Sequence, residues 1–314
     1  MGTFARECMS AHPHRLLYGI ASCAGAGTIW GMGFFFGKIA LREMSVGHMV
    51  LYRFLFACVA MVPICYHHRP RFNRGEWKLL ILGSFLGVPL QFLLQFKGLS
   101  LTTVSHASLM VGALPVMLAV GAAIFARERV DAIGWLSLIG STCGAALIAL
   151  GAHHALGASG PSLAGDLLVV LSLLISLFWI LLNKHLMQHH SAIVVTSWGL
   201  LIGTAMLVPI VLLHNGLPPV LHISVRAWAA LAASGLLCTA VTTLLWNFGL
   251  TQIPASMAGV FLNLEPLTGS LLGVFLLSEH LGPSAWIGGA LIMTAAVSLT
   301  ARPHGHTEAP SALI

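Results

Sequence analysis

The sequence predicts an all-α polytopic membrane protein in which ten transmembrane helices form two inverted five-helix repeats. Apolar residues make up 57% of the 314 residues, above the roughly 45–50% of soluble domains. Charged residues make up only 8%, whereas soluble domains carry about 25%. Fifteen Lys and Arg and nine Asp and Glu are too few to solvate a soluble globule. A soluble enzyme, a disordered chain and a disulfide scaffold are therefore excluded.

Hydrophobic stretches of membrane-spanning length follow one another along the chain. A membrane helix needs about 20 mostly apolar residues to cross about 30 Å of hydrocarbon. Ten stretches meet this requirement: Leu17–Gly37, His48–Tyr66, Lys78–Phe96, Val104–Phe125, Ile133–Leu150, Asp166–Leu186, Ile193–Leu213, Ala227–Phe248, Ser256–Leu277 and Ser284–Thr300. The first is longer than a signal-peptide core, and no clear A-x-A-like site precedes Lys38. We therefore expect it to be retained as a helix.

Positive charges in the connections set the expected orientation. With the N-terminus in the cytoplasm, ten Lys and Arg of the loops and tails fall on the cytoplasmic side and four on the outer side. This bias predicts that both termini are cytoplasmic, and the expected location is the inner (plasma) membrane. The basic residues lie between apolar stretches rather than in one patch, so the lipid bilayer and not nucleic acid is the expected partner.

An internal repeat organises the chain. A shift of 151 residues superposes eight identical pairs without a gap: Trp77/Trp228, Gly98/Gly249, Leu99/Leu250, Ser105/Ser256, Ala107/Ala258, Pro115/Pro266, Glu128/Glu279 and Trp135/Trp286. The two Trp pairs, the Pro pair and the Glu pair carry the repeat, because Leu and Ala matches mean little in an apolar chain. Five helices per repeat is an odd number, so the second repeat crosses the membrane in the opposite sense, as is typical of secondary transporters. We expect a tail (1–16), a first repeat (17–150), a Gly/Ser/Pro-rich linker (151–165), a second repeat (166–301) and a second tail (302–314).

The residues that mark the repeat resemble a known family. They are Trp30-Gly31, Tyr52-Arg53-Phe54, Gly98-Leu99, Ser105–Ser108, Pro115, Glu128, Glu265-Pro266 and Glu279. From about residue 18 to 301 the chain resembles the EamA-like members of the drug/metabolite transporter superfamily. The resemblance implies a ten-helix exporter of amino acids or related metabolites, with helices 1 and 6 contributing to a central cavity. This chain has Leu114 where its second repeat has Glu265, so the two halves differ chemically.

One acidic residue and two prolines predict a site near the bilayer midplane. Glu265 lies about ten residues into a predicted span, where a charge costs about 2.5–3.5 kcal/mol on insertion scales. Its carboxyl group could hold and release a proton as a coupling or substrate-contact residue. It could also simply bond a neighbouring helix. Pro266 and Pro115 each remove a backbone donor at equivalent places, and paired breaks of this kind either line a site between repeats or only kink the helices.

Arg53 is the other charged residue inside a predicted span. It lies nearer the outer side, and Lys38 and Lys97 are expected at the same level. The three could attract a substrate carboxylate at the outer mouth. The alternative is that Arg53 extends toward lipid headgroups.

Two pairs at i,i+4 spacing each occupy one helix face: Trp30 with Phe34, and Trp179 with Asn183. They either line the cavity or pack against other helices. His106, near the outer end of the fourth helix, is the one histidine that could belong to a site, since the paired histidines fall in loops or the tail.

Other functional classes find little support in the sequence. No zinc, redox or nucleotide motif occurs, so neither a cofactor nor a metal is expected. The string Gly157–Gly160 resembles the serine motif of intramembrane proteases but lies in the polar linker. A channel, or a lipid or nucleotide-sugar translocator on the same fold, stays open as an alternative. Small-xxx-small glycine pairs permit close helix packing, within one bundle or in a homodimer.

The sequence therefore predicts a secondary transporter of small metabolites that works by alternating access, with proton coupling through Glu265. It predicts no enzymatic activity.

Overall fold

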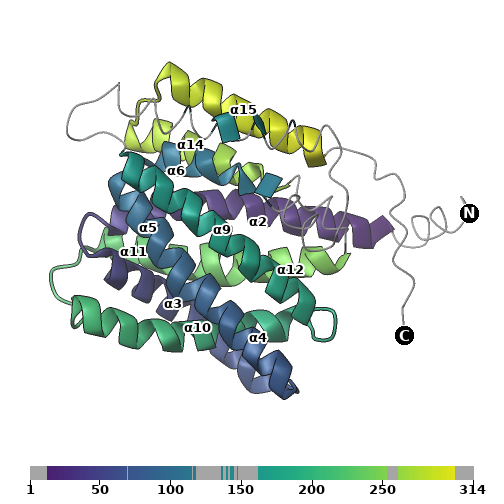
Figure 1. Ribbon diagram of the computed structural model, residues 1–314. Helices are drawn as coiled ribbons and strands as arrows, with labels where there is room; N and C mark the ends of the chain where they lie inside the picture. The colour runs from purple at the N-terminus through teal and green to yellow at the C-terminus, as the bar shows by residue number, and fades with distance from the viewer. Residues whose placement is uncertain are drawn as a thin grey trace, which may run out of the picture.

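The computed structural model describes residues 13–68, 70–114, 116–117, 136, 139–140, 142–144, 147, 162–252 and 261–300. Every regular element in these ranges is a helix (Figure 1), which confirms the all-helical prediction. The first half contains α2 (Pro13–Ala40), α3 (Val46–His67), α4 (Arg74–Phe85), the π-helix η1 (Leu86–Leu90), α5 (Gln91–Leu101) and α6 (Val104–Val111). The second half contains α9 (Leu163–Leu186), α10 (Ala192–Asn215), α11 (Val225–Gly235), the π-helix η2 (Leu236–Val241), α12 (Thr242–Gln252), α14 (Leu264–Leu277) and α15 (Pro283–Thr300).

Six continuous helical stretches of the described chain are long and apolar enough to cross a membrane. They are Leu16–Ala40, Val46–His67, Arg74–Leu101, Leu163–Leu186, Ala192–Asn215 and Val225–Gln252, and α14 is a shorter apolar helix. Most of the predicted helix Ile133–Leu150 and the end of Val104–Phe125 lie outside the described residues. Large apolar side chains such as Leu213 and Phe275 are exposed on the exterior, as expected of surfaces that face lipid.

Polar capping residues determine where the helices begin. Six helices start after a residue whose side chain accepts the backbone N–H three positions later: Ser45, Asn73, Thr103, Ser162, Ser191 and Ser224. These caps satisfy N–H groups that have no partner within the helix. They also correct two predicted boundaries. The third helix begins at Arg74 rather than Lys78, because Asn73 and Glu76 form a capping box, and α9 begins at Leu163 rather than Asp166, because Ser162 caps it.

The two halves carry matching elements at a constant offset. Both ends of α12 lie 151 residues after the corresponding ends of α5, and η2 covers the positions that correspond to η1. The starts of α3 and α10 are separated by 146 residues, as are Pro63 and Pro209 inside them. The difference of five arises because the segment between the starts of α10 and α11 is longer than that between α3 and α4.

Equivalent helices of the two halves run in opposite directions. The beginning of α3 meets the end of α10, since Asn215 Nδ2 donates to Ser45 Oγ (3.2 Å). At the other end of the pair, Trp198 Nε1 near the start of α10 donates to the carbonyl of His68 after α3 (3.1 Å). The two helices are therefore antiparallel, as equivalent helices of inverted halves would be.

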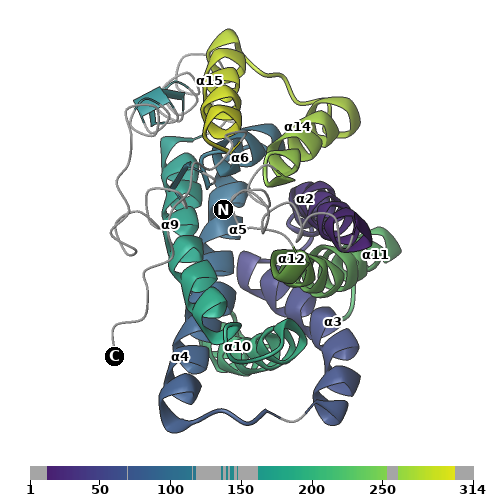
Figure 2. The ribbon, with the colours of Figure 1, turned by 90° about the vertical axis from the view of Figure 1, so that its right-hand side faces the viewer.

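Glycines allow the helices of the two halves to approach closely. A Cβ on Gly98 of α5 would lie 2.7 Å from the carbonyl oxygen of Gly165 in α9. A Cβ on Gly31 of α2 would likewise meet the backbone of Glu265 in α14. Figure 2 shows α9 and α4 on one side of the bundle and α2, α11 and α12 on the other, with α3 and α10 at one end. These small residues serve packing within the chain, so they carry no argument for a dimer.

Candidate functional site

A cavity of about 80 Å³ lies between the two halves, with room for several water molecules at roughly 10–15 Å³ each. Ten elements line it, five from each half: α2, α3, η1, α5, α6, α9, α10, η2, α12 and α14. The predicted site residues Trp30, Arg53, Trp179, Asn183 and Glu265 line this cavity. Its composition, apolar and aromatic with a few polar groups, is that of a small-molecule site.

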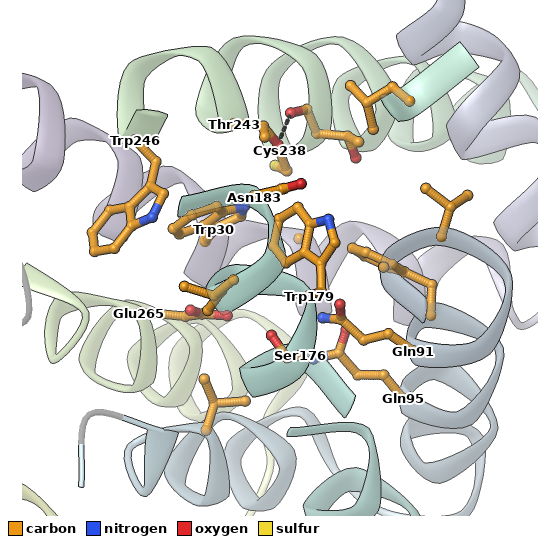
Figure 3. A pocket seen from close by; sticks show the side chains of 18 of the residues that line it. Trp30, Gln91, Gln95, Ser176, Trp179, Asn183, Cys238, Thr243, Trp246 and Glu265 are labelled. Carbon is orange, nitrogen blue, oxygen red and sulfur yellow. Dashed lines mark hydrogen bonds between the residues drawn. The ribbon is translucent and has the colours of Figure 1, made fainter. Parts of the chain in front are cut away.

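Tryptophans form one wall of the cavity. Trp30 of α2 contacts Trp246 of α12 with ring centroids 5.4 Å apart, and Figure 3 shows Trp30 between Trp246 and Trp179. Trp179 lies against Gly87 in η1, where any larger side chain would collide with the indole ring. Phe34 and Asn183 also line the cavity, so both i,i+4 pairs predicted from the sequence face it.

Arg53 is buried within this site and is held on several sides. Its side chain is only 3% exposed, so it does not reach the exterior. Nε donates to Thr239 Oγ1 (2.7 Å) and Nη2 to the carbonyl of Cys238 (3.1 Å). The guanidinium group also lies over the rings of Phe92 (4.9 Å) and Phe96 (5.1 Å). These contacts stabilise a cation that would otherwise be costly in the membrane interior.

The π-helical turn of η2 explains why a backbone carbonyl is available to Arg53. In an α-helix the N–H of Thr242 would donate to Cys238, four residues earlier. Here it donates to Leu237 and Thr239 instead. The wide turn leaves the Cys238 carbonyl without its α-helical donor, and Arg53 takes that place. Such π turns are frequent at functional sites.

The structure does not bring Lys38 and Lys97 to Arg53. Lys38 Nζ donates to the carbonyls of Leu99 and Thr102 at the end of α5, and Lys97 is exposed. The expected cluster of three cations at an outer mouth is therefore absent from the described residues. Arg53 is the cation that faces the cavity.

Glu265 enters the cavity from the first turn of α14 and is 9% exposed. A helix N-terminus is a favourable place for a carboxylate. The helix begins here because the chain turns at Leu262 and Asn263. The Leu262 carbonyl, which Pro266 cannot satisfy, accepts the Glu265 N–H instead (3.2 Å). The predicted break is therefore present, but its carbonyl has a partner.

The corresponding helix of the first half is interrupted at a similar place. The helix α6 ends at Val111, and the N–H groups of Gly112 and Ala113 donate to carbonyls three residues earlier. Pro115 itself lies outside the described residues. Pro266 is buried but does not line the cavity.

Several polar residues of the cavity escaped the sequence-based reasoning. Gln91 and Gln95 of α5 face it from the side opposite Trp30 (Figure 3), and Ser176 and Thr243 also contribute. The available signal was the i,i+4 spacing of two glutamines within an apolar stretch. Gln91 and Gln95 are both buried, so they supply hydrogen-bonding groups in an otherwise apolar wall.

His106 does not line the cavity. It lies in α6 beside Asp166 of α9, with 3.9 Å between Nδ1 and Oδ2. In the part of the chain that the structure describes, no group of three or more His, Cys, Asp or Glu is placed to hold a metal ion.

Comparisons with known proteins agree with this architecture. The EamA-like transporter family matches residues 17–150 and 163–301. An uncharacterized transporter of Archaeoglobus fulgidus is 25% identical over 88% of this chain and 95% of its own length. The uncharacterized transporter YetK of Bacillus subtilis is 22% identical over 86% of this chain and 85% of its own. A solved crystal structure aligns with a TM-score of 0.63 at 16% identity, covering 90% of this chain and 95% of that one, and so supports the fold alone.

Proposed function

Because the chain belongs to the EamA-like transporter family, we propose that it is a secondary transporter that moves small metabolites by alternating access of its two halves. The observation that carries this proposal is the cavity between those halves, into which Arg53 and Glu265 both face. Binding sites between inverted repeats are typical of secondary transporters. A transporter that rocks around such a site would expose it to each side of the membrane in turn.

The proposed topology has ten helices in two inverted repeats, in the inner membrane, with both termini cytoplasmic. The antiparallel arrangement of α3 and α10 supports the inversion. The excess of Lys and Arg on one side of the predicted spans supports the orientation.

The expected substrate is an amino acid or a related metabolite that carries a carboxylate, and export is the expected direction. A guanidinium group is well suited to a carboxylate, because it presents several N–H donors in one plane. Only two of the donors of Arg53 are committed to Thr239 and Cys238. The tryptophan wall offers a large flat surface for the apolar part of such a substrate.

Glu265 is the proposed coupling residue. It is the acidic residue among those that line the cavity, and its access to water would alternate with the rocking of the two halves. A carboxyl group that takes a proton on one side and releases it on the other would link substrate movement to a pH gradient.

Reconstituted vesicles test this proposal directly. Wild type and Glu265→Gln are loaded into proteoliposomes, and accumulation of a radiolabelled amino-acid panel is measured under an imposed pH gradient. We expect Glu265→Gln to lose pH-driven accumulation while it retains exchange without a gradient. Glu308→Gln, the same chemical change in the predicted C-terminal tail, serves as the control. Unchanged accumulation in Glu265→Gln would refute the coupling role.

A further inference from the structure

A second buried titratable pair lies outside the cavity and joins the two halves. His106 belongs to α6 and Asp166 to α9, and they are 4% and 0% exposed. The gap of 3.9 Å between His106 Nδ1 and Asp166 Oδ2 is too long for a hydrogen bond. Neither atom has any other hydrogen-bond partner. Two buried polar atoms that face each other without a bond are unusual, because each is costly to leave unpaired.

The surroundings hold both residues in place from their other sides. Thr102 Oγ1 donates to the second carboxylate oxygen of Asp166 (2.7 Å). The backbone N–H of His106 donates to Thr103 Oγ1 (3.2 Å), which caps α6. Each residue is therefore held by a hydrogen bond to a neighbouring threonine, and only Nδ1 and Oδ2 face each other without one.

The other charged groups near this pair are already committed. Lys38, at the end of α2, donates to the carbonyls of Leu99 and Thr102. Glu279, after α14, accepts hydrogen bonds from the backbone of Val104 and Ser105 at the start of α6 (2.9 and 2.8 Å). Asp166 is thus the carboxylate available to His106 from the elements described around it.

We propose that His106 and Asp166 form a proton-binding site, separate from the cavity, that fastens the two halves together at this end of the molecule. A proton on Nδ1 would make His106 a donor to Asp166 Oδ2. Closure of the gap to about 2.8 Å would then form a charge-assisted hydrogen bond. When the ring is neutral, that charge assistance is lost, and the tautomer with its proton on Nε2 leaves Nδ1 and Oδ2 as two acceptors that repel each other. Both effects loosen the contact.

The repeat shows that this device exists at one end only. The positions 151 residues after Thr102 and His106 are Ile253 and Met257, and the position 146 residues before Asp166 is Ile20. None of these can hold a proton. If the halves rock as proposed above, protonation from the side of His106 therefore slows opening on that side alone, and this consequence rests on the proposed function.

The pH dependence of thermal stability tests the site without any transport assay. Unfolding temperatures are measured in detergent from about pH 5.5 to 8 for wild type, His106→Gln, Asp166→Asn and the double variant. A protonated histidine that gains a carboxylate partner on folding stabilises the folded state at low pH. This stabilisation is lost as the pH rises and the histidine gives up its proton. We expect wild type to exceed both single variants by about 2 °C or more at the acidic end, and this margin to vanish at the alkaline end.

Two comparisons make this result decisive. The double variant should lose little more than either single variant at acidic pH, because both remove the same interaction. The exposed His185→Gln should show no pH-dependent margin. A margin that is the same at every pH, or equal to that of His185→Gln, overturns the proposal. If His106→Gln fails to fold, the nearly isosteric Asp166→Asn carries the same comparison.

Exchange in vesicles then tests the link to movement. Acidification of the side on which His106 lies should slow amino-acid exchange by wild type but not by His106→Gln or Asp166→Asn. Equal slowing in all three overturns the fastening role. If wild type itself exchanges none of the panel, the proposed function fails, whereas the stability measurement still decides whether the proton site exists.

Discussion

At the residue scale, Arg53 shows how a buried charge is made tolerable and useful at once. One hydroxyl, one backbone carbonyl and two aromatic rings surround its guanidinium group. A bare cation in the bilayer interior is unfavourable, so each of these contacts offsets part of that cost. A Cβ on Gly33 would lie 3.5 Å from Nη1 and Nη2, an ordinary van der Waals contact. The hydrogen bonds to Thr239 and Cys238 therefore hold the group in one orientation.

We expect Arg53→Lys to reduce exchange at least about tenfold while the protein still folds, because loss of a charge-assisted hydrogen bond costs about 1.5–3 kcal/mol. An ammonium group is a point charge that cannot donate in a fixed plane to Thr239, Cys238 and a carboxylate together. Exchange of the amino-acid panel in vesicles measures the effect. Arg226→Lys, which keeps its charge at the start of α11, should exchange like wild type. Full activity in Arg53→Lys would contradict a substrate-binding role.

Glu43 provides a pH-dependent prediction outside the membrane-spanning segments. Hydrogen bonds from the side chain and backbone of Ser224 lower the pKa of Glu43 below its usual value of 4.5. A lowered pKa contributes stability above the usual value, and that stability is lost as pH falls through the lowered one. We therefore expect Glu43→Gln to lower the unfolding temperature at neutral pH, and the difference from wild type to shrink below about pH 4. A difference that persists in acid would contradict this assignment.

At the element scale, the sequence predicted the helices well and their internal irregularities poorly. Hydropathy located six long spans, and the Trp77/Trp228 pair placed α4 and α11 at equivalent positions. The π turns η1 and η2 were not foreseen, because an i→i−5 bond changes the backbone register without a mark in the hydropathy pattern. The Cys238 carbonyl could not be recognised as a ligand of Arg53 for the same reason.

The cavity residues likewise fall into those that the sequence reveals and those that only the packed structure reveals. Trp30, Trp179 and Glu265 stood out because bulky aromatic or charged side chains within apolar spans are conspicuous. Gln91 and Gln95 were overlooked because two neutral polar residues in a span are unremarkable until tertiary packing turns them inward. The expected proximity of Lys38 and Arg53 came from depth alone, and depth does not say which way around the helix a side chain points.

Close packing between α5 and α9 gives a prediction for the helices themselves. Replacing a mid-helix glycine by alanine ordinarily stabilises by about 0.5–1 kcal/mol. A Cβ on Gly98 would lie 2.7 Å from the Gly165 carbonyl and 2.8 Å from Val169 Cγ2, so the helices must separate. We expect Gly98→Ala to lower the unfolding temperature, since overpacking costs about 1–3 kcal/mol. Gly25→Ala, whose Cβ would be 4.0 Å from its nearest neighbour, should leave it unchanged or raise it. Equal responses would contradict the close approach.

At the scale of the whole molecule, the two halves match in backbone and differ in side chains. The position of α10 that corresponds to Arg53, 146 residues later, is Gly199, and the position of α9 that corresponds to Gly33 is Trp179. At these two pairs of positions, the first half has its large side chain, Arg53, on α3, and the second half has its large side chain, Trp179, on α9. A symmetric scaffold therefore encloses an asymmetric cavity, to which the first half contributes the cation and its aromatic partners and the second half contributes Trp179.

Two hydrogen bonds of this scaffold are equivalent and lie at opposite ends of the α3–α10 pair. Tyr52 of α3 donates to the carbonyl of Pro219 in the loop after α10 (2.8 Å). Trp198, 146 residues later in α10, donates to the carbonyl of His68 after α3 (3.1 Å). Each ring also meets a repeat-related tryptophan edge-on, Tyr52 with Trp228 and Trp198 with Trp77. The same contact therefore ties each half to the connection of the other.

If the two ends open in turn, loss of one bond favours opening at its own end. A hydrogen bond worth about 1 kcal/mol changes the equilibrium between two states roughly fivefold. We therefore expect Tyr52→Phe and Trp198→Phe to shift that equilibrium in opposite directions, and the double variant to return it toward wild type, since the sites are far apart and their effects add. Distances between spin labels placed across each end would report the populations. Shifts in the same direction would show that these bonds stabilise the fold without taking part in alternating access.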